Sequence, residues 1–126
     1  MNKVIHFEIP FDNEERATKF YTDVFGWKLN KLPEMDYCFV TTVPVDEKTM
    51  IPKEAGAING GMMKRHPTGE HPVVVIDVPS VDDYVRKIQS AGGKVVMQKM
   101  SIGDFGFYAR VSDTEGNVIG IWQNRK

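Results

Sequence analysis

A histidine and a glutamate two residues apart are the first side chains in this sequence that could perform chemistry. His6 and Glu8 lie in residues 3–9, a run rich in β-branched and aromatic residues that predicts a strand. Side chains alternate along a strand, so His6 and Glu8 share one face, and Ile5 points to the other. A histidine on such a face could bind a ligand, transfer a proton or donate a hydrogen bond. The pair therefore forms a candidate catalytic or ligand-orienting site.

Both residues also have purely structural interpretations, which the sequence leaves open. His6 could be partly buried and satisfied by a neighbour. Glu8, on a half-buried strand, could form an ion pair with a basic residue such as Arg110. It could instead bind a polar ligand group, or act as a base whose pKa is raised by burial.

The lone cysteine and the other histidines favour structural roles. Cys38 has the opposite parity to Tyr37 and Phe39, so we expect a small buried hydrophobe on the helix side of its strand and not a nucleophile. His66 and His71, with Glu70 between them, lie in a segment with Pro and Gly. A segment of this kind has no fixed geometry for a metal and predicts a solvated loop.

Composition excludes several classes of protein. The 126 residues include 16 Lys or Arg and 17 Asp or Glu, a net charge of −1, so nothing favours nucleic acid as a partner. A single cysteine forms no zinc framework and no intrachain disulfide. No secretory leader and no apolar run of membrane-spanning length is apparent, so we expect a cytoplasmic protein that does not bind membranes.

Hydrophobic periodicity predicts the same order of elements twice: strand, helix, then three strands. Both expected helices have capping signals, an Asp12 and Glu15 capping box before the first and Ser80 before the second. The expected elements of the first half are strands at 3–9, 27–31, 37–43 and 57–63 and a helix ending at Gly26. Those of the second half are strands at 72–78, 94–99, 105–111 and 117–123 and a helix ending at Gly92 and Gly93.

The repeat predicts one domain over residues 1–126, with half one at 1–63, a linker at 64–71 and half two at 72–126. Each half would expose one face of its sheet, so the halves are expected to share a core. Aligning them places Gly60 opposite Gly120 and Met62 opposite Trp122. A shorter ferredoxin-like α/β dimer is the rival fold, and it predicts about four strands per chain.

A set of motifs in this order resembles the vicinal oxygen chelate superfamily, the group of glyoxalase I, bleomycin resistance proteins and extradiol dioxygenases. The resemblance implies an α+β fold in which two βαβββ modules form one glyoxalase-like domain with a cavity between curved mixed sheets. It also implies a homodimer. The motifs are HFEIP at 6–10, RA at 16–17, FY at 20–21, VFGW at 24–27, GGMM at 60–63, DTEGN at 113–117 and GIWQ at 120–123.

The superfamily's metal ligands fall on positions that mostly lack donor atoms here. By the resemblance, the first and last strands of the two halves supply the ligands, at His6, Gly60, Val73 and Gly120. Glycine and valine cannot coordinate an ion, so no cofactor is expected. If a divalent metal binds, His6, Glu8 and His71 are the substitute ligands, because His71 has the same strand parity as Val73.

Aromatic and methionine side chains are expected to line the cavity and bind the ligand. Phe107 and Tyr108 must point to opposite faces, so only one of the two can take part. The expected lining residues are Phe39, Met62, Phe107 and Trp122.

The sequence therefore predicts a protein that binds a small organic molecule in the inter-sheet cavity without the usual metal. His6 and Glu8 would supply the polar contacts. Two alternatives stay open: a metal-dependent lyase or dioxygenase with an unorthodox site near His6, and a non-catalytic interaction module with a filled core. Whether the chain is an enzyme is left open, because this fold hosts many chemistries.

Overall fold

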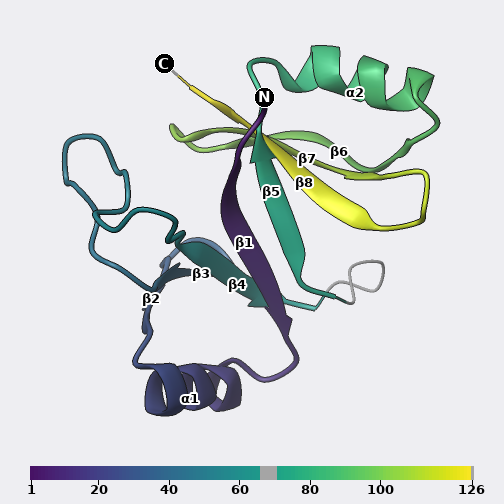
Figure 1. Cartoon of the computed structure of the whole chain (residues 1–126). Helices are drawn as coiled ribbons and strands as arrows, with labels where there is room; N and C mark the ends of the chain where they lie inside the picture. Colours follow the sequence, from purple (N-terminus) through teal and green to yellow (C-terminus); the bar gives the residue numbers. More distant parts are fainter. Residues whose placement is uncertain (66–70, 126) are drawn as a thin grey trace. The chain divides into compact units, whose positions relative to one another are not determined.

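The computed structural model describes residues 1–65 and 71–125, and these contain eight strands and two helices (Figure 1). Eight strands exclude the four-strand alternative and confirm an α+β fold. The elements in chain order are β1 (Val4–Phe11), α1 (Glu14–Phe25), β2 (Lys28–Lys31), β3 (Tyr37–Thr41), β4 (Gly60–Lys64), β5 (Val73–Asp77), α2 (Val81–Ser90), β6 (Lys94–Ile102), β7 (Gly106–Ser112) and β8 (Val118–Asn124).

The chain divides into two compact units. The first-half unit is His6–Pro72, and the second-half unit joins Met1–Ile5 to Val73–Lys126. The first five residues therefore group with the second half, whereas the sequence placed them in the first. Hydrogen bonds explain the difference, because the Asp77 amide donates to the Lys3 carbonyl at 2.9 Å and the Asn2 amide side chain donates to the Asp77 carbonyl at 3.0 Å.

Each unit contains four strands in the same pattern. In the first-half unit the order is β2-β3-β4-β1, with β1 parallel to β4 and the other neighbours antiparallel. In the second-half unit the order is β5-β8-β7-β6, with β5 parallel to β8 and the other neighbours antiparallel. The repeat expected from periodicity is thus present in the strand topology.

The ends of α1 follow from its flanking residues. Asn13 caps the helix, because its side-chain oxygen accepts a hydrogen bond from the Arg16 amide at 2.8 Å. The expected cap, Asp12, lies one residue earlier and forms an ion pair with Arg65 at 2.9 Å instead. Gly26 ends the helix with φ +71°, a left-handed conformation that glycine adopts without steric cost.

The second helix, α2, is capped by Ser80 as the sequence indicates, with the Asp83 amide donating to the Ser80 hydroxyl at 3.2 Å. It packs on β6, β7 and β8 of its own unit (Figure 1). Neither helix in the described part of the chain has the length and apolar character that a membrane crossing requires.

A separate apolar core lies under each helix. In the first-half unit it comprises Phe11, Cys38, Val40 and Met62, with Ala17 and Tyr21 of α1 packed against it. Cys38 is only 3% exposed, so its predicted role as a small buried hydrophobe is confirmed. In the second-half unit the core comprises Val78, Val81, Ala109, Val111 and Ile121.

Candidate functional site

His6 and Glu8 lie on the face of the first-half sheet that points away from its apolar core. The strand register fixes their neighbours: Glu8 is paired with Gly61 on β4, and Gly61 is paired with Phe39 on β3. Tyr37 is two residues from Phe39 and therefore shares this face. We call the set His6, Glu8, Tyr37, Phe39 and Gly61 the polar face.

A chain of hydrogen bonds joins the three polar side chains of this face. His6 Nε2 and Tyr37 Oη are hydrogen-bonded at 2.8 Å, and Tyr37 Oη donates to Glu8 Oε2 at 3.1 Å. The tyrosine hydroxyl thus stands between the histidine and the carboxylate. Strands β1 and β3, which are not adjacent in the sheet, are linked through side chains across β4.

Burial shapes the electrostatics of the site. Glu8 is 6% exposed, so its carboxylate depends on hydrogen bonds in place of water. Burial lowers the pKa of His6 below its ordinary value, and the negative charge of Glu8 opposes this by raising it. Burial is the larger effect, so the imidazole is neutral at neutral pH and can accept a proton or a hydrogen bond.

The position of Tyr37 depends on a glycine. A Cβ atom at Gly61 would overlap the Tyr37 hydroxyl, so only glycine leaves room for the phenol at this point of β4. The second-half unit repeats the arrangement, since a Cβ at Gly120 would lie 2.7 Å from the Tyr108 hydroxyl. There the hydroxyl accepts a hydrogen bond at 2.9 Å from Nε of Arg110, a residue that is 7% exposed.

This register corrects the expected last-strand ligand position of the first half. Glu8 pairs with Gly61 just as Val75 pairs with Gly120 in the second-half unit, so Gly61 and not Gly60 is the counterpart of Gly120. Gly60 points to the opposite face, where a Cβ would meet the Phe7 ring. A shift of one residue along a strand exchanges its faces.

The donor set does not fit the divalent ion that the resemblance implies. At positions 61 and 120 the space for a ligand side chain is taken by a tyrosine hydroxyl, and Val73 has no donor. No group of three His, Cys, Asp or Glu side chains among residues 1–65 and 71–125 is arranged to hold a metal. His71 is exposed, so the substitute set His6, Glu8 and His71 is not assembled.

Two of the four expected lining residues belong to the first-half unit, and only one lies on the polar face. Phe39 contacts Tyr37 edge to face, with ring centroids 5.8 Å apart. Met62 is 1% exposed and packs with Cys38 in the helix-side core. Its neighbour Met63 pairs with Tyr37 and occupies the polar side, so the expected placement of Met62 is wrong by one residue.

The other two expected lining residues lie on opposite faces of the second-half sheet. Phe107 packs against the core under α2, with the ammonium group of Lys99 4.6 Å from its ring centroid. Trp122 pairs with Tyr108 across β7 and β8, and its indole nitrogen donates to Asn124 Oδ1 at 2.8 Å. Tyr108, not Phe107, therefore shares a face with Trp122.

The sequence places Tyr37 on the same face as Phe39 but does not reveal that its hydroxyl belongs to the site. Its parity with Phe39 gave the face correctly. The missing signal was the glycine on the neighbouring strand, because glycine on a strand marks a close approach by another group. The strand register decides whether Gly60 or Gly61 is the glycine that the Tyr37 hydroxyl approaches.

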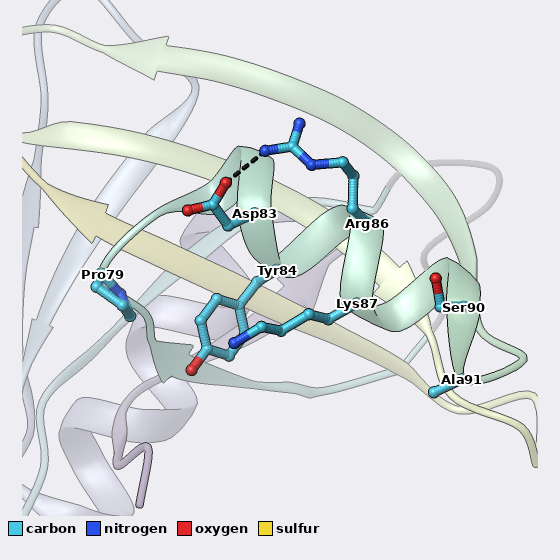
Figure 2. Close-up of a pocket in the computed structure, with 7 residues that line it drawn as sticks. All are labelled: Pro79, Asp83, Tyr84, Arg86, Lys87, Ser90 and Ala91. Carbon is cyan, nitrogen blue, oxygen red and sulfur yellow. Dashed lines mark hydrogen bonds and ion pairs between the residues drawn. The ribbon is translucent and has the colours of Figure 1, made fainter.

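A separate hollow of about 640 Å³ lies on the outer side of α2 in the second-half unit. In Figure 2, Arg86 is turned toward Asp83, to which it is ion-paired, and Lys87 extends alongside Tyr84. The Lys87 ammonium lies 4.5 Å from the Tyr84 ring centroid, and the Tyr84 hydroxyl donates to Asn2 Oδ1 at 3.1 Å. These groups are paired at an open surface, which makes the hollow a weaker candidate than the polar face.

Sequence comparisons give partial matches to known proteins. A family model described as "Bleomycin resistance protein-like N-terminal" matches residues 3–42. Two curated proteins named "Putative glyoxylase CFP32", from Mycobacterium bovis and Mycobacterium tuberculosis, are each 32% identical over 117 residues. The match includes 88% of this chain but only 41% of either relative, so the chain spans about two fifths of their length.

Solved structures match over nearly the whole chain at low identity. A hypothetical protein, BH1468 from Bacillus halodurans, has a TM-score of 0.67 at 15% identity, covering 99% of this chain and 96% of that one. Methylmalonyl-CoA epimerase from Mycobacterium tuberculosis has a TM-score of 0.65 at 14% identity, and the match covers 97% of this chain and 87% of that one. A glyoxalase/bleomycin resistance protein/dioxygenase superfamily member from Vibrio splendidus has a TM-score of 0.63 at 12% identity, and the match covers 98% of this chain and 99% of that one.

Proposed function

We propose that this protein binds a small organic molecule on its polar face without a divalent metal. The premise is that the chain has the vicinal oxygen chelate fold of the glyoxalase/bleomycin resistance/dioxygenase superfamily. The fold itself is that of structures matching 97% or more of the chain. The ligand, and the absence of a metal from its binding, are our proposals.

One observation supports the proposal most directly: the hydrogen-bonded series His6, Tyr37 and Glu8 on the polar face. Buried polar groups cost free energy unless they are satisfied, and a connected set of this kind holds its members in one geometry. Fixed polar groups beside an aromatic ring are typical of sites that orient a small ligand. Phe39 provides that ring here.

Relatives suggest which molecule to test first. One structure similar in fold is a methylmalonyl-CoA epimerase in complex with methylmalonyl-CoA, and the family model that matches residues 3–42 is named for bleomycin resistance. Methylmalonyl-CoA and bleomycin are therefore the two probes, and they test two different ligand chemistries.

Calorimetric titration of each probe into chelator-treated protein tests the proposal. We expect saturable binding of one probe, weakened at least tenfold in Glu8→Gln and in Tyr37→Phe, with His71→Ala as the matched control at an exposed position. Binding that is absent until Zn²⁺, Ni²⁺ or Mn²⁺ is added, and lost again in His6→Ala, would support the metal-dependent lyase or dioxygenase. Absence of binding under every condition would favour the interaction module.

We also propose a homodimer, as expected from the resemblance. Light scattering coupled to size exclusion measures the mass in solution. A mass near 14.3 kDa, that of one chain, would contradict the dimer.

A further inference from the structure

We infer that Tyr37 holds His6 as the Nε2-protonated tautomer, so that the site offers Nδ1 as a hydrogen-bond acceptor and selects ligands through a group that donates a hydrogen bond. This inference rests on the proposed function, because it names the chemical class of the ligand at the same site. It assigns contact with the ligand to His6 and a positioning role to Tyr37.

Counting protons along the hydrogen-bonded series gives the tautomer. An ionised carboxylate only accepts hydrogen bonds, so the single proton of the Tyr37 hydroxyl goes to Glu8 Oε2, 3.1 Å away. The hydroxyl oxygen can then only accept from His6 Nε2 at 2.8 Å. The imidazole nitrogen at that contact must therefore have the proton, and Nδ1 has a lone pair in the neutral ring. The opposite tautomer would require a protonated Glu8.

The other ring nitrogen can be reached from outside. His6 is partly exposed, and none of residues 1–65 and 71–125 forms a hydrogen bond with its Nδ1. Among the described residues, no buried side-chain nitrogen or oxygen is left without a partner. Nδ1 is therefore in contact with solvent, where a ligand group could replace water.

Gly61 keeps the Tyr37 hydroxyl within hydrogen-bond reach of His6 and Glu8. The phenol lies directly over the glycine, since a Cβ there would overlap the hydroxyl. The ring also contacts Phe39 edge to face. The hydroxyl is therefore confined between β1 and β4, and its hydrogen bonds to the two β1 side chains are set by packing as well as by attraction.

The class of ligand follows from the lone pair on His6 Nδ1. An imidazole nitrogen with a lone pair accepts from hydroxyl or N–H groups and repels the lone pairs of ethers, esters and carboxylates. The aromatic ring of Phe39 favours an apolar body next to the donor. A hydroxyl or N–H group on an aromatic or other apolar skeleton fits these conditions.

Nitrogen-15 NMR of the histidine ring tests the tautomer independently of any ligand. Protonated and lone-pair nitrogens have well-separated shifts, and we expect His6 to show a protonated Nε2 and an unprotonated Nδ1. In Tyr37→Phe the preference should weaken toward a mixture, because the accepting oxygen is gone. Tyr21→Phe, the same change in a ring stacked on Trp27 at 4.9 Å, should leave it unchanged. A protonated Nδ1 in the unmodified protein would overturn the inference.

Phenol and anisole, which differ only in the hydroxyl proton, test the ligand class. We expect phenol to shift the His6 ring signals at concentrations at least tenfold lower than anisole, and Tyr37→Phe to reduce that ratio. Equal binding of the two probes would overturn the donor preference while leaving the proposed binding function intact. If neither probe binds and the two larger probes also fail, the proposed function itself is wrong.

Discussion

Tyr37 lies over Gly61, so that the phenol hydroxyl fills the space where a side chain at position 61 would begin. The hydroxyl is in turn hydrogen-bonded to His6 and Glu8. A position where the superfamily resemblance leads one to expect a metal ligand is thus used to seat a tyrosine from the next strand.

Replacing Gly61 with alanine should displace Tyr37 and break its two hydrogen bonds. Because the atoms in the way belong to a side chain and not to the backbone, the protein should fold, with a loss of about 1–3 kcal/mol as buried polar groups lose hydrogen bonds. Urea unfolding of the four proteins in a double-mutant cycle with Tyr37→Ala measures the coupling. A cost for Gly61→Ala that is just as large in the Tyr37→Ala background would show that the two residues are not coupled.

Stability should depend on pH through His6. Burial lowers the folded-state pKa of His6 below the ordinary value of 6.5, so between these two values the unfolded chain binds the extra proton. The contribution of His6 is therefore fully present above pH 6.5 and is lost as pH falls through the folded pKa.

Urea unfolding across pH 5–8 measures this effect. His6→Gln should flatten the dependence in that window, whereas His71→Gln, at an exposed position, should preserve it. Identical curves for the two variants would rule out His6 as the source.

The charge of Glu8 should be visible in the titration of His6. Glu8 raises the pKa of His6 against the larger lowering effect of burial, so Glu8→Gln should move the pKa further below its ordinary value. The glutamine carboxamide oxygen can still accept from Tyr37, which keeps the change mainly electrostatic. NMR titration of the ring proton gives the value directly, and an upward shift would contradict the proposed arrangement.

Cys38 should be almost unreactive in the folded protein. Burial, together with the neighbouring Glu14 carboxylate, raises the pKa of this thiol to about 11. The Sγ atom donates to Glu14 Oε1 at 3.1 Å. Because the thiolate is the reacting species, a chromogenic disulfide reagent at pH 8 should react at least a hundredfold more slowly with the native protein than with protein in urea. Comparable rates would indicate that the β3 environment opens readily.

Asn13, and not Asp12, should stabilise the start of α1. Removing the cap by Asn13→Ala should lower the free energy of unfolding by about 0.5–2 kcal/mol, because the Arg16 amide loses its acceptor. Asp12→Ala removes an exposed ion pair with Arg65 and should cost no more than about 1 kcal/mol. Urea unfolding of both variants distinguishes the two residues. A larger loss of unfolding free energy in Asp12→Ala than in Asn13→Ala would show that Asp12 caps the helix, as the sequence indicated.

The sequence alone determined the elements, their order and the helix-side position of Cys38. Periodicity and local signals such as Ser80 and Gly26 act over a few residues, and both helices and all eight strands were therefore predicted at close to their observed positions. The repeat of a strand, a helix and three strands followed from the same local information. So did the shared face of His6 and Glu8 on one strand and that of Tyr37 and Phe39 on another, which require only alternation within each strand.

Only the tertiary structure decided which residues of different strands meet. Pairing Glu8 with Gly61 exchanged the expected roles of Gly60 and Gly61 and moved Met62 into the core, because a shift of one residue reverses every face of a strand. The hydrogen bonds of Tyr37 join residues 29 and 31 positions apart, and no local signal specifies them. The polar face therefore depends on packing between distant segments, where a glycine on one strand leaves room for a tyrosine from the next.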